Sequence, residues 1–256
     1  MVMSIASRTT QNKRAVTGIA CQGCAFSPLC LDRDKVFESS NTEFLHGLKQ
    51  GKPIRKGTSI YSQGAEFKSL YVVRSGALKA INVSSAGVEQ VTGFYLPGDV
   101  VGFDGMADGF HVNSLVALDT VSLCELPMAQ VDFLLSANAQ TRRHIFSLQS
   151  QSMNQQQRFL LQHCQDTAEE RVAAFLLDIS GRYERRHLSA DKFRLPMSRK
   201  DIASYLGLAV ETISRLFSRF QASEFIAVEG REVTLLDLSA FGADGHSEDQ
   251  ELRLIG

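Results

Sequence analysis

Cysteine supplies the most reactive side chains of this 256-residue chain, and three of its five cysteines lie within ten residues of one another. Cys21, Cys24 and Cys30 share a segment that contains glycine and proline, and Cys124 stands alone about a hundred residues later. Four thiolates suit either structural zinc or an iron–sulfur cluster. The alternatives differ in consequence, because zinc is redox-silent whereas an exposed cluster can react with oxygen.

Other readings of the reactive residues remain open at this point. The Cys21-x2-Cys24 pair alone is typical of a redox dithiol, but the βαβ pattern that supports such a motif is absent. Cys164, near the end of a long predicted helix, is expected to be a structural thiol that is at least partly buried. No Ser/His/Asp set, histidine metal spacing or glycine-rich phosphate loop is present. We therefore expect no enzyme, and the alternative is a cysteine oxidoreductase with a low-pKa thiol.

Composition sets the broad class. The hydrophobic content of 44% and the charged content of 21% are those of a globular protein with one large domain or two ordinary ones. No signal peptide or membrane-length apolar run is visible, so we expect a cytoplasmic protein without a membrane partner, whose thiols are kept reduced. The net charge of −1 does not decide whether nucleic acid is bound.

Residues 198–236 have the layout of a DNA-binding module. Ser198 with Asp201 forms a capping-box pattern, Gly207-Leu208 supplies a tight turn, and a second helix is expected from Ala209 to about Gln221. Two short β-rich runs follow and predict a hairpin, or wing. The buried face of the second helix is expected to comprise Val210, Ile213, Leu216, Phe217 and Phe220.

The opposite face of that helix carries side chains that can read bases. A carboxylate accepts from the cytosine amino group, an arginine grips guanine with two hydrogen bonds, and a serine is short enough to touch a base edge. The alternative is a Glu–Arg surface pair on an ordinary helix. We predict DNA contacts from Glu211, Ser214, Arg215 and Arg219, and phosphate contacts from Arg199 and Lys200.

Patterns along the chain divide it into six segments. Short β-branched runs broken by glycine predict strands at 69–74, 77–83, 90–95 and 115–126, and favour a barrel or jelly-roll-like sandwich. The expected boundaries are a tail at 1–20, a cysteine-rich segment at 21–50, a β-domain at 51–132, a long helix at 133–165, the DNA-binding module at 166–242 and an acidic tail at 243–256.

The long helix has two semi-apolar stripes. One is a heptad seam that favours a partner helix, and the other can cover the β-domain. A single-domain core helix without a partner is the alternative. The segment contains no Asp or Glu, and glutamines in the seam weaken a dimer because their amides must find partners. The seam comprises Phe146, Gln149, Met153, Gln156 and Leu160, and the second stripe comprises Ile145, Leu148, Ser152 and Phe159.

These motifs resemble the FNR branch of the CRP/FNR transcription regulators over nearly the whole chain. The most specific is Tyr205-Leu-Gly-Leu-Ala-Val-Glu-Thr-Ile-Ser-Arg215, whose Glu-x-x-Ser-Arg face is similar to the FNR reading pattern. The others are the Cys21-x2-Cys24-x5-Cys30 segment, Gln90-Val-Thr-Gly-Phe94, Cys124-Glu-Leu-Pro127 and Ala168-Glu-Glu-Arg171.

The resemblance implies an α+β fold with a cyclic-nucleotide-binding-like β-roll (jelly roll), a long dimerisation helix and a C-terminal winged helix-turn-helix. It implies that Cys21, Cys24, Cys30 and Cys124 hold an oxygen-labile [4Fe-4S] cluster. The loaded homodimer would bind a TTGAT-N4-ATCAA-like palindrome, read by Glu211, Ser214 and Arg215, and would recruit RNA polymerase, with the Val83–Gly87 turn near the contact surface. The alternative is a thiol- or zinc-based DNA-binding regulator.

Two positions depart from the patterns of related proteins. The arginine and serine that clamp a cyclic phosphate fall at His111 and Val112, so no cyclic nucleotide is expected. Enteric members carry an acidic seam residue where this chain has Gln156. We therefore hypothesise that the apo protein retains more dimer than members with the acid.

Overall fold

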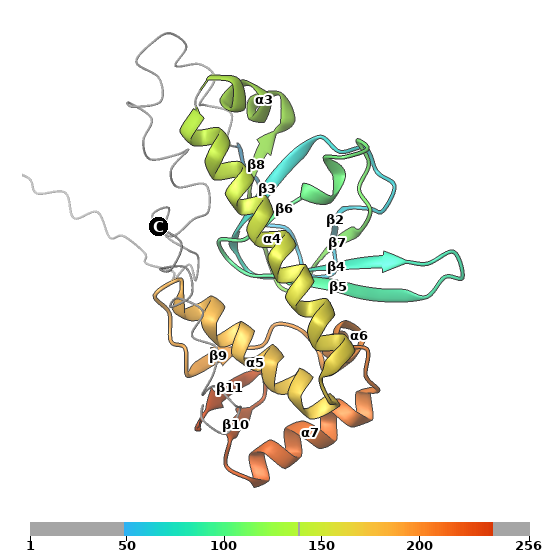
Figure 1. Ribbon diagram of the computed structural model, residues 1–256, viewed down its shortest axis with the longest axis vertical. Coiled ribbons are helices and arrows are strands. Elements are labelled where there is room, and N and C mark those ends of the chain that lie inside the picture. Colours follow the sequence, from blue (N-terminus) through green and yellow to red (C-terminus); the bar gives the residue numbers. More distant parts are fainter. Residues whose placement is uncertain (1–48, 138, 238–256) are drawn as a thin grey trace, which may run out of the picture.

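The computed structural model describes residues 49–137 and 139–237 and confirms the α+β class. A β-roll lies beside one long helix, which runs on to the C-terminal module that the sequence predicts to bind DNA (Figure 1). The roll contains β1 (Lys49–Gln50), β2 (Ser59–Tyr61), β3 (Ser69–Ser75), β4 (Leu78–Val83), β5 (Glu89–Tyr95), β6 (Val100–Val101), the short 3-10 helix η3 (Phe103–Gly105), β7 (Ser114–Ala117) and β8 (Ser122–Pro127).

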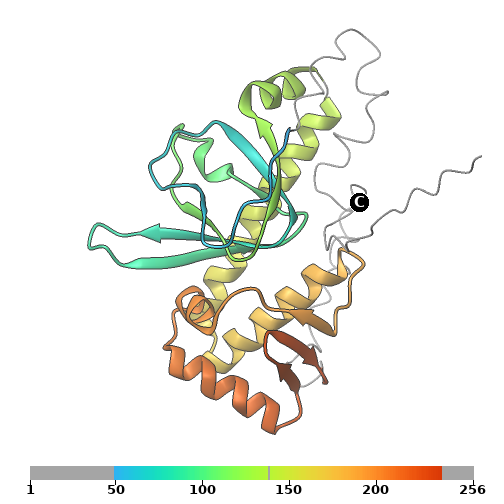
Figure 2. The same cartoon turned by 180° about the vertical axis from the view of Figure 1, so that it is seen from behind.

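Two antiparallel four-stranded sheets form the roll, in the orders β1-β8-β3-β6 and β2-β7-β4-β5. Strand β3 is buried on both faces. Its Val73 packs inside the roll against Leu78 and Leu115, whereas Leu70 and Val72 pack outward toward the helices. The β4–β5 hairpin extends away from the rest of the roll (Figure 2).

The single strand expected over Leu115–Leu126 is wrong, because the segment divides into β7 and β8, which belong to different sheets. The chain turns between them, where Leu118 N donates to the carbonyl of Ala77. The turn passes over Gly76 so closely that a Cβ there would lie 2.4 Å from the Thr120 carbonyl oxygen. The short strands β1, β2 and β6 were not predicted.

The helix expected from residue 133 is also divided, into α3 (Met128–Ala137) and α4 (Ala139–Gln165). The final carbonyls of a helix need partners outside it. Ser136 Oγ donates to the carbonyl of Phe133, and Arg142 Nη1 donates to that of Leu135 at 3.0 Å. The Arg142 side chain therefore satisfies one of the final carbonyls of α3, and α4 begins six residues later than expected.

The DNA-binding module begins with α5 (Ala168–Glu184), which has a capping box formed by Thr167 and Glu170. The remaining elements are β9 (Lys192–Arg194), α6 (Arg199–Leu206), α7 (Val210–Ala222), β10 (Ile226–Glu229) and β11 (Glu232–Leu235). The three strands form one sheet in the order β10-β11-β9.

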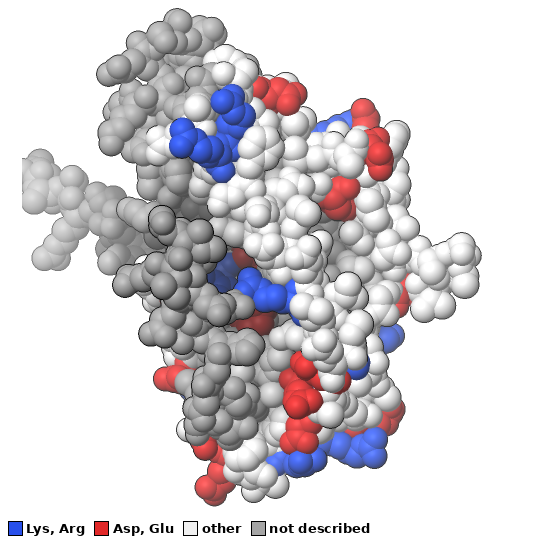
Figure 3. All heavy atoms as spheres, in the orientation of Figure 1, with Lys and Arg blue, Asp and Glu red and all other residues white. Residues whose placement is uncertain are grey.

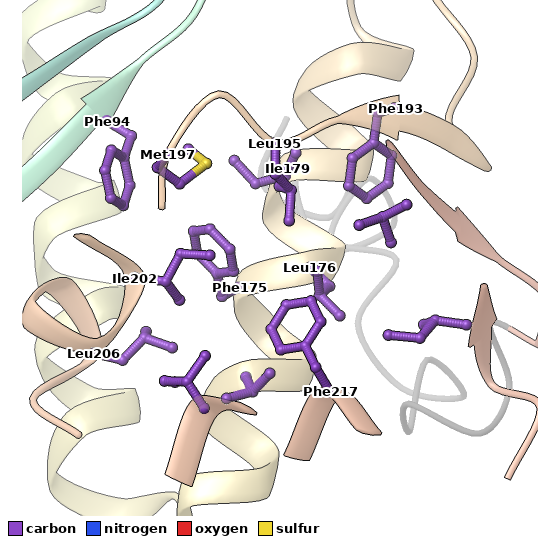
Figure 4. Close-up of a cluster of buried hydrophobic side chains, with 14 of the residues drawn as sticks. Phe94, Phe175, Leu176, Ile179, Phe193, Leu195, Met197, Ile202, Leu206 and Phe217 are labelled. Carbon is purple, nitrogen blue, oxygen red and sulfur yellow. The ribbon is translucent and has the colours of Figure 1, made fainter. Parts of the chain in front are cut away.

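One apolar core joins the roll to the DNA-binding module. Phe94 of β5 packs edge-on against Phe175 of α5 and contacts the ring of Tyr205 on α6. Leu96 and Leu118 of the roll belong to the same buried cluster. Figure 4 shows Phe94 facing the buried side chains of the module. Burial of apolar surface therefore holds the two parts together.

A buried guanidinium reinforces this junction. Arg182 of α5 is 7% exposed, donates to the Phe94 carbonyl at 2.8 Å and forms an ion pair with Asp99. Arg186 pairs with the other oxygen of Asp99. Burial disfavours the charged guanidinium, but Asp99 and Asp178 outweigh this effect and raise the pKa of Arg182 above its ordinary value.

Polar contacts extend the junction to α6 and to β9. Lys79 of β4 forms an ion pair with Asp201, the carboxylate that also completes the α6 capping box. Val91 N donates to Ser204 Oγ at 2.9 Å. Asp119, in the β7–β8 turn, accepts from Arg194 of β9 at 3.1 Å. The module is thus held along α5, α6 and β9.

Replacing Arg182 by methionine should destabilise the protein by about 3 kcal/mol, because the Asp99 carboxylate and the Phe94 carbonyl lose a buried charged donor. The free energy of unfolding in urea measures the effect. Arg185→Met, at the exposed residue that caps the C-terminus of the same helix, is the matched control and should change stability by less than about 0.5 kcal/mol. Equal effects of the two variants would contradict the structural role of Arg182.

Candidate DNA-binding surface and metal centre

Helices α6 and α7 form the predicted helix-turn-helix. Ser198 Oγ accepts from the backbone N–H of Asp201, and the Asp201 carboxylate accepts from that of Ser198, so the capping box is present. Gly207 ends α6 with a φ of 64°, a left-handed conformation that favours glycine. The chain can then turn sharply into α7, which presents its outer face to solvent.

Helix α7 buries Ile213, Leu216, Phe217 and Phe220, as expected. Val210 was assigned to the same face, but that assignment is wrong, since this side chain is 37% exposed. Val210 is the first residue of the helix, where the chain has just left the turn and little of the module lies over it. Its apolar side chain is instead exposed next to Glu211.

The base-reading residues share the exposed face of α7. Glu211, Ser214 and Arg215 are all exposed, and Ser214 Oγ donates to the Val210 carbonyl at 3.0 Å within the helix. Figure 3 shows positive side chains gathered at the end of the molecule where α7 lies, with acidic side chains immediately above them. This arrangement can present a carboxylate, a hydroxyl and a guanidinium to one groove.

The two residues expected to bind phosphate have different environments. The guanidinium carbon of Arg199 lies 3.3 Å from the centre of the Phe217 ring, and burial lowers the pKa of Arg199 to about 10. The side chain remains protonated at neutral pH, but it is stacked on α7 rather than extended into solvent. Arg199 therefore packs on α7 and is partly exposed, whereas Lys200 is exposed, and the phosphate contacts of both residues stay predictions.

Arg219 lies one turn beyond Arg215 and is engaged in an ion pair. Its Nη2 atom is 2.8 Å from Oε2 of Glu169, in the first turn of α5. Sequence reasoning missed this contact because fifty residues separate the partners, although the acidic first turn of α5 was visible. The charge of Arg219 is thus partly neutralised at the edge of the reading face.

Of the predicted cluster ligands, only Cys124 lies within the described residues. It is half-buried on β8, where it faces Val72 of β3 on one side and Gln50 of β1 on the other. Cys21, Cys24 and Cys30 lie outside the described residues. Within residues 49–137 and 139–237, no group of three or more His, Cys, Asp or Glu residues could hold a metal ion.

Cys124 nevertheless suits a ligand supplied together with the N-terminal cysteines. The chain enters the roll through β1, and its residue Gln50 pairs directly with Cys124. An extended chain spans at most about 3.3–3.6 Å per residue, so the twenty positions from Cys30 to Gln50 give ample reach. Thiolates are the donors that iron–sulfur clusters require, so the chemistry and position of Cys124 fit a ligand of such a group.

Cys164 corrects another expectation. It was predicted to be a thiol at least partly buried, but it is exposed at the end of α4. The neighbouring His163 and Phe159 turn toward the DNA-binding module, where Phe159 stacks on Tyr205 with ring centroids 4.4 Å apart. Cys164 lies on another side of the helix and is not part of that contact.

The two stripes of α4 have opposite environments. Ile145 is buried against the roll, and Leu148 and Phe159 pack at the edges of the two neighbouring cores. The seam stripe faces away from these cores. Its apolar members Phe146, Met153 and Leu160 are between 54% and 63% exposed, Gln149 is half-buried and Gln156 is exposed.

The carboxylate of Asp104, on η3, lies beside His111 and Val112, the positions that correspond to a cyclic-phosphate clamp. Buried His111 stacks on Tyr61 with ring centroids 3.5 Å apart, and its Nδ1 atom is 3.2 Å from Asp104. The other oxygen of Asp104 accepts from the backbone N–H groups of Val112 and Asn113, both at 3.1 Å. These donors already hold an anion, and a phosphate would meet a negative charge.

Comparison with known proteins decides the family. The chain is 44% identical to the transcriptional activator protein Anr of Pseudomonas protegens over 228 residues, which cover 88% of this chain and 91% of Anr. It is 40% identical to the fumarate and nitrate reduction regulatory protein of Salmonella typhimurium, over 90% of this chain and 92% of that protein. The chain belongs to the FNR-type regulators of the CRP/FNR family.

Domain models and solved structures agree with this membership. Residues 52–138 match the cyclic nucleotide-binding domain, and residues 170–243 match the Crp-like helix-turn-helix domain. FixK2 from Bradyrhizobium japonicum has a similar structure, with a TM-score of 0.70 and 28% identity over 77% of this chain and 97% of FixK2. An FNR-type chain is a transcription regulator, so α7 is assigned to a DNA-binding module. No helix among the described residues is long and apolar enough to span a membrane.

Replacing Arg215 by alanine should weaken binding to an FNR-type palindrome by about 1–3 kcal/mol and relax discrimination at the guanine that it contacts. Fluorescence anisotropy with single-base variants of the palindrome measures both effects. Lys200→Ala is the control, because loss of a phosphate contact weakens all sequences alike. An equal loss on palindrome and random DNA for Arg215→Ala would assign Arg215 to phosphate instead.

Proposed function

We propose that this protein is an oxygen-responsive transcription regulator that carries a [4Fe-4S] cluster under low oxygen. Cys21, Cys24, Cys30 and Cys124 would hold the cluster. The loaded homodimer would bind a TTGAT-N4-ATCAA-like palindrome and recruit RNA polymerase to control genes of anaerobic metabolism. The observation that carries the proposal is the position of Cys124, which lies beside the strand through which the cysteine-rich segment enters the roll.

The bound cluster would supply a group that oxygen can destroy, and the chain supplies a route from that event to α4. Cys124 packs at the edge of the core formed by Leu70, Val72 and Leu126, and Ile145 of α4 is part of the same core. A change in how Cys124 is held therefore acts on the layer that supports the dimerisation helix. The three remaining ligands would connect the N-terminal segment to this point.

Dimerisation would pair the exposed seams of two α4 helices. Phe146, Met153 and Leu160 recur every seven residues, which is the spacing of a coiled-coil contact. Twofold symmetry matches a palindrome, because each module then reads one half-site. Two linked half-sites bind far more tightly than either alone.

Two further parts of the proposal concern partners. The Val83–Gly87 turn is at the tip of the β4–β5 hairpin, and neighbouring Val88 is 62% exposed, which favours contact with a large partner such as RNA polymerase. The Asp104 carboxylate accepts hydrogen bonds from the backbone N–H groups of Val112 and Asn113. Because these donors are already occupied by an anion, the roll would bind no cyclic nucleotide. The regulatory signal would therefore come from the cluster held by the cysteines and not from a nucleotide in the roll.

The neutral seam should leave part of the apo protein dimeric. Gln156 is exposed on the seam, and α4 contains no acidic residue that would repel its twofold partner. Analytical ultracentrifugation of apo protein at tens of micromolar should show dimer, and Gln156→Glu should shift it toward monomer. Gln157→Glu, one position off the seam, is the matched control. A purely monomeric apo wild type would contradict the hypothesis.

Anaerobic purification tests the cluster directly. We expect about four irons and four sulfides per chain, with visible absorption that bleaches as air is admitted. Cys124→Ser should lose the absorption and most of the iron, whereas Cys164→Ser, at an exposed cysteine outside the proposed ligand set, should retain both.

The alternative is a thiol- or zinc-based regulator that uses the same cysteines. Zinc in place of iron, or no metal in wild type purified without oxygen, would favour that alternative. The assignment of the helix-turn-helix to DNA binding would stand under this outcome, because that assignment does not depend on what the cysteines hold.

A further inference from the structure

Glu169 is in contact with the recognition helix but belongs to a different element. It lies in the first turn of α5, and its Oε2 atom is 2.8 Å from Nη2 of Arg219. The adjacent Glu170 accepts from the backbone N–H and hydroxyl of Thr167 and so serves the capping box. The α5 capping box therefore does not use Glu169, and its side chain is directed to Arg219.

Arg219 is placed to bind DNA backbone when it is released. It follows Glu211 and Arg215 at four-residue spacing along the exposed side of α7, and its side chain is 63% exposed. An arginine at this edge of a recognition helix meets phosphate, whose contacts fix affinity without reading sequence. A carboxylate already bound to the guanidinium occupies the donors that phosphate requires.

We propose that Glu169 limits the DNA affinity of this regulator by competing with a DNA phosphate for Arg219. The inference rests on the proposed DNA contact of α7. In free protein the ion pair holds Arg219 against α5. On binding, Arg219 exchanges the carboxylate for phosphate, and the freed carboxylate stays near the backbone. Affinity is therefore lower than α7 alone would give, and sequence discrimination is unchanged.

The ion pair is not needed to orient α7. Phe175 and Leu176 of α5 and Ile213 and Phe217 of α7 are buried in one cluster, which fixes how the two helices pack. A partly exposed ion pair contributes little to stability. Removing the Glu169 charge should therefore leave the fold intact and change only the availability of Arg219.

A double-mutant cycle on the full-length, anaerobically purified protein tests the proposal. Wild type, Glu169→Gln, Arg219→Gln and the double variant are titrated with a palindromic duplex and a random duplex at several salt concentrations. Glu184→Gln removes the same charge from the other end of α5 and is the matched control. Circular dichroism and thermal unfolding check the fold of each variant.

We expect Glu169→Gln to tighten binding to both duplexes by about two- to fivefold, and Arg219→Gln to reduce the slope of log Kd against log salt by about one because it loses a phosphate contact. In the Arg219→Gln background Glu169→Gln should have less than half of its effect on log Kd. Equal tightening in both backgrounds would overturn the proposal, because it would reduce Glu169 to a general negative charge. Weaker binding by Glu169→Gln would also overturn it and would make Glu169 a positioning residue.

The random duplex separates this inference from the proposed function. Wild type that binds palindrome and random DNA equally would refute specific recognition by α7. The effect of Glu169→Gln on binding to random DNA, with and without Arg219, would still decide whether Glu169 competes with phosphate for Arg219. No result of one comparison is therefore mistaken for a result of the other.

Discussion

The structure depends on the buried ion pair between Arg182 and Asp99. Arg182 belongs to the DNA-binding module and Asp99 to the roll, and a charge buried in this way is tolerated only when its hydrogen-bond partners are all in place. Arg182 also contacts the Phe94 carbonyl and Asp178, and Asp99 also accepts from Arg186 and from Leu96 N. The position of the helix-turn-helix is therefore specified by directional contacts as well as by apolar burial.

Helix α4 has two roles, one on each side: it packs on the two parts of the molecule, and it presents the seam to solvent. One side packs Ile145 on the roll and Phe159 against Tyr205 of α6, so the helix contacts both parts of the molecule. The other side keeps Phe146, Met153 and Leu160 exposed. A signal that alters the support of α4 at the roll can consequently affect the seam and the DNA-binding module together, because one rigid element touches all three.

Local signals made the helix-turn-helix predictable from sequence. The Ser198–Asp201 capping box and the left-handed Gly207 depend on residues only a few positions apart. The β7–β8 division was missed because Leu115–Leu126 is apolar at both ends, and the deciding contacts come from Ala77 and Ile54. Extended strands far apart in sequence pair by tertiary context, which a local pattern does not contain.

The candidate site shows the same limit. The exposed face of α7 followed from helical spacing, whereas the stacking of Arg199 on Phe217 and the pairing of Arg219 with Glu169 did not. Both contacts join different helices, so their geometry exists only after α5, α6 and α7 pack. Cys124 was placed on a strand by pattern, but its position beside Gln50 required the register of β1 on β8.

The core shared by the roll and the helix-turn-helix determines whether the two parts of this protein can be separated or exchanged. Five roll residues, Ala77, Val91, Phe94, Leu96 and Leu118, belong to a cluster whose other buried members lie beyond residue 170. A fragment cut at the end of α4 would leave Met197 and Tyr205 without these neighbours, and Arg182 without its counter-ion. The DNA-binding half is thus not an interchangeable cassette, and a chimera that grafts it onto another sensor must carry the matching β5 surface with it.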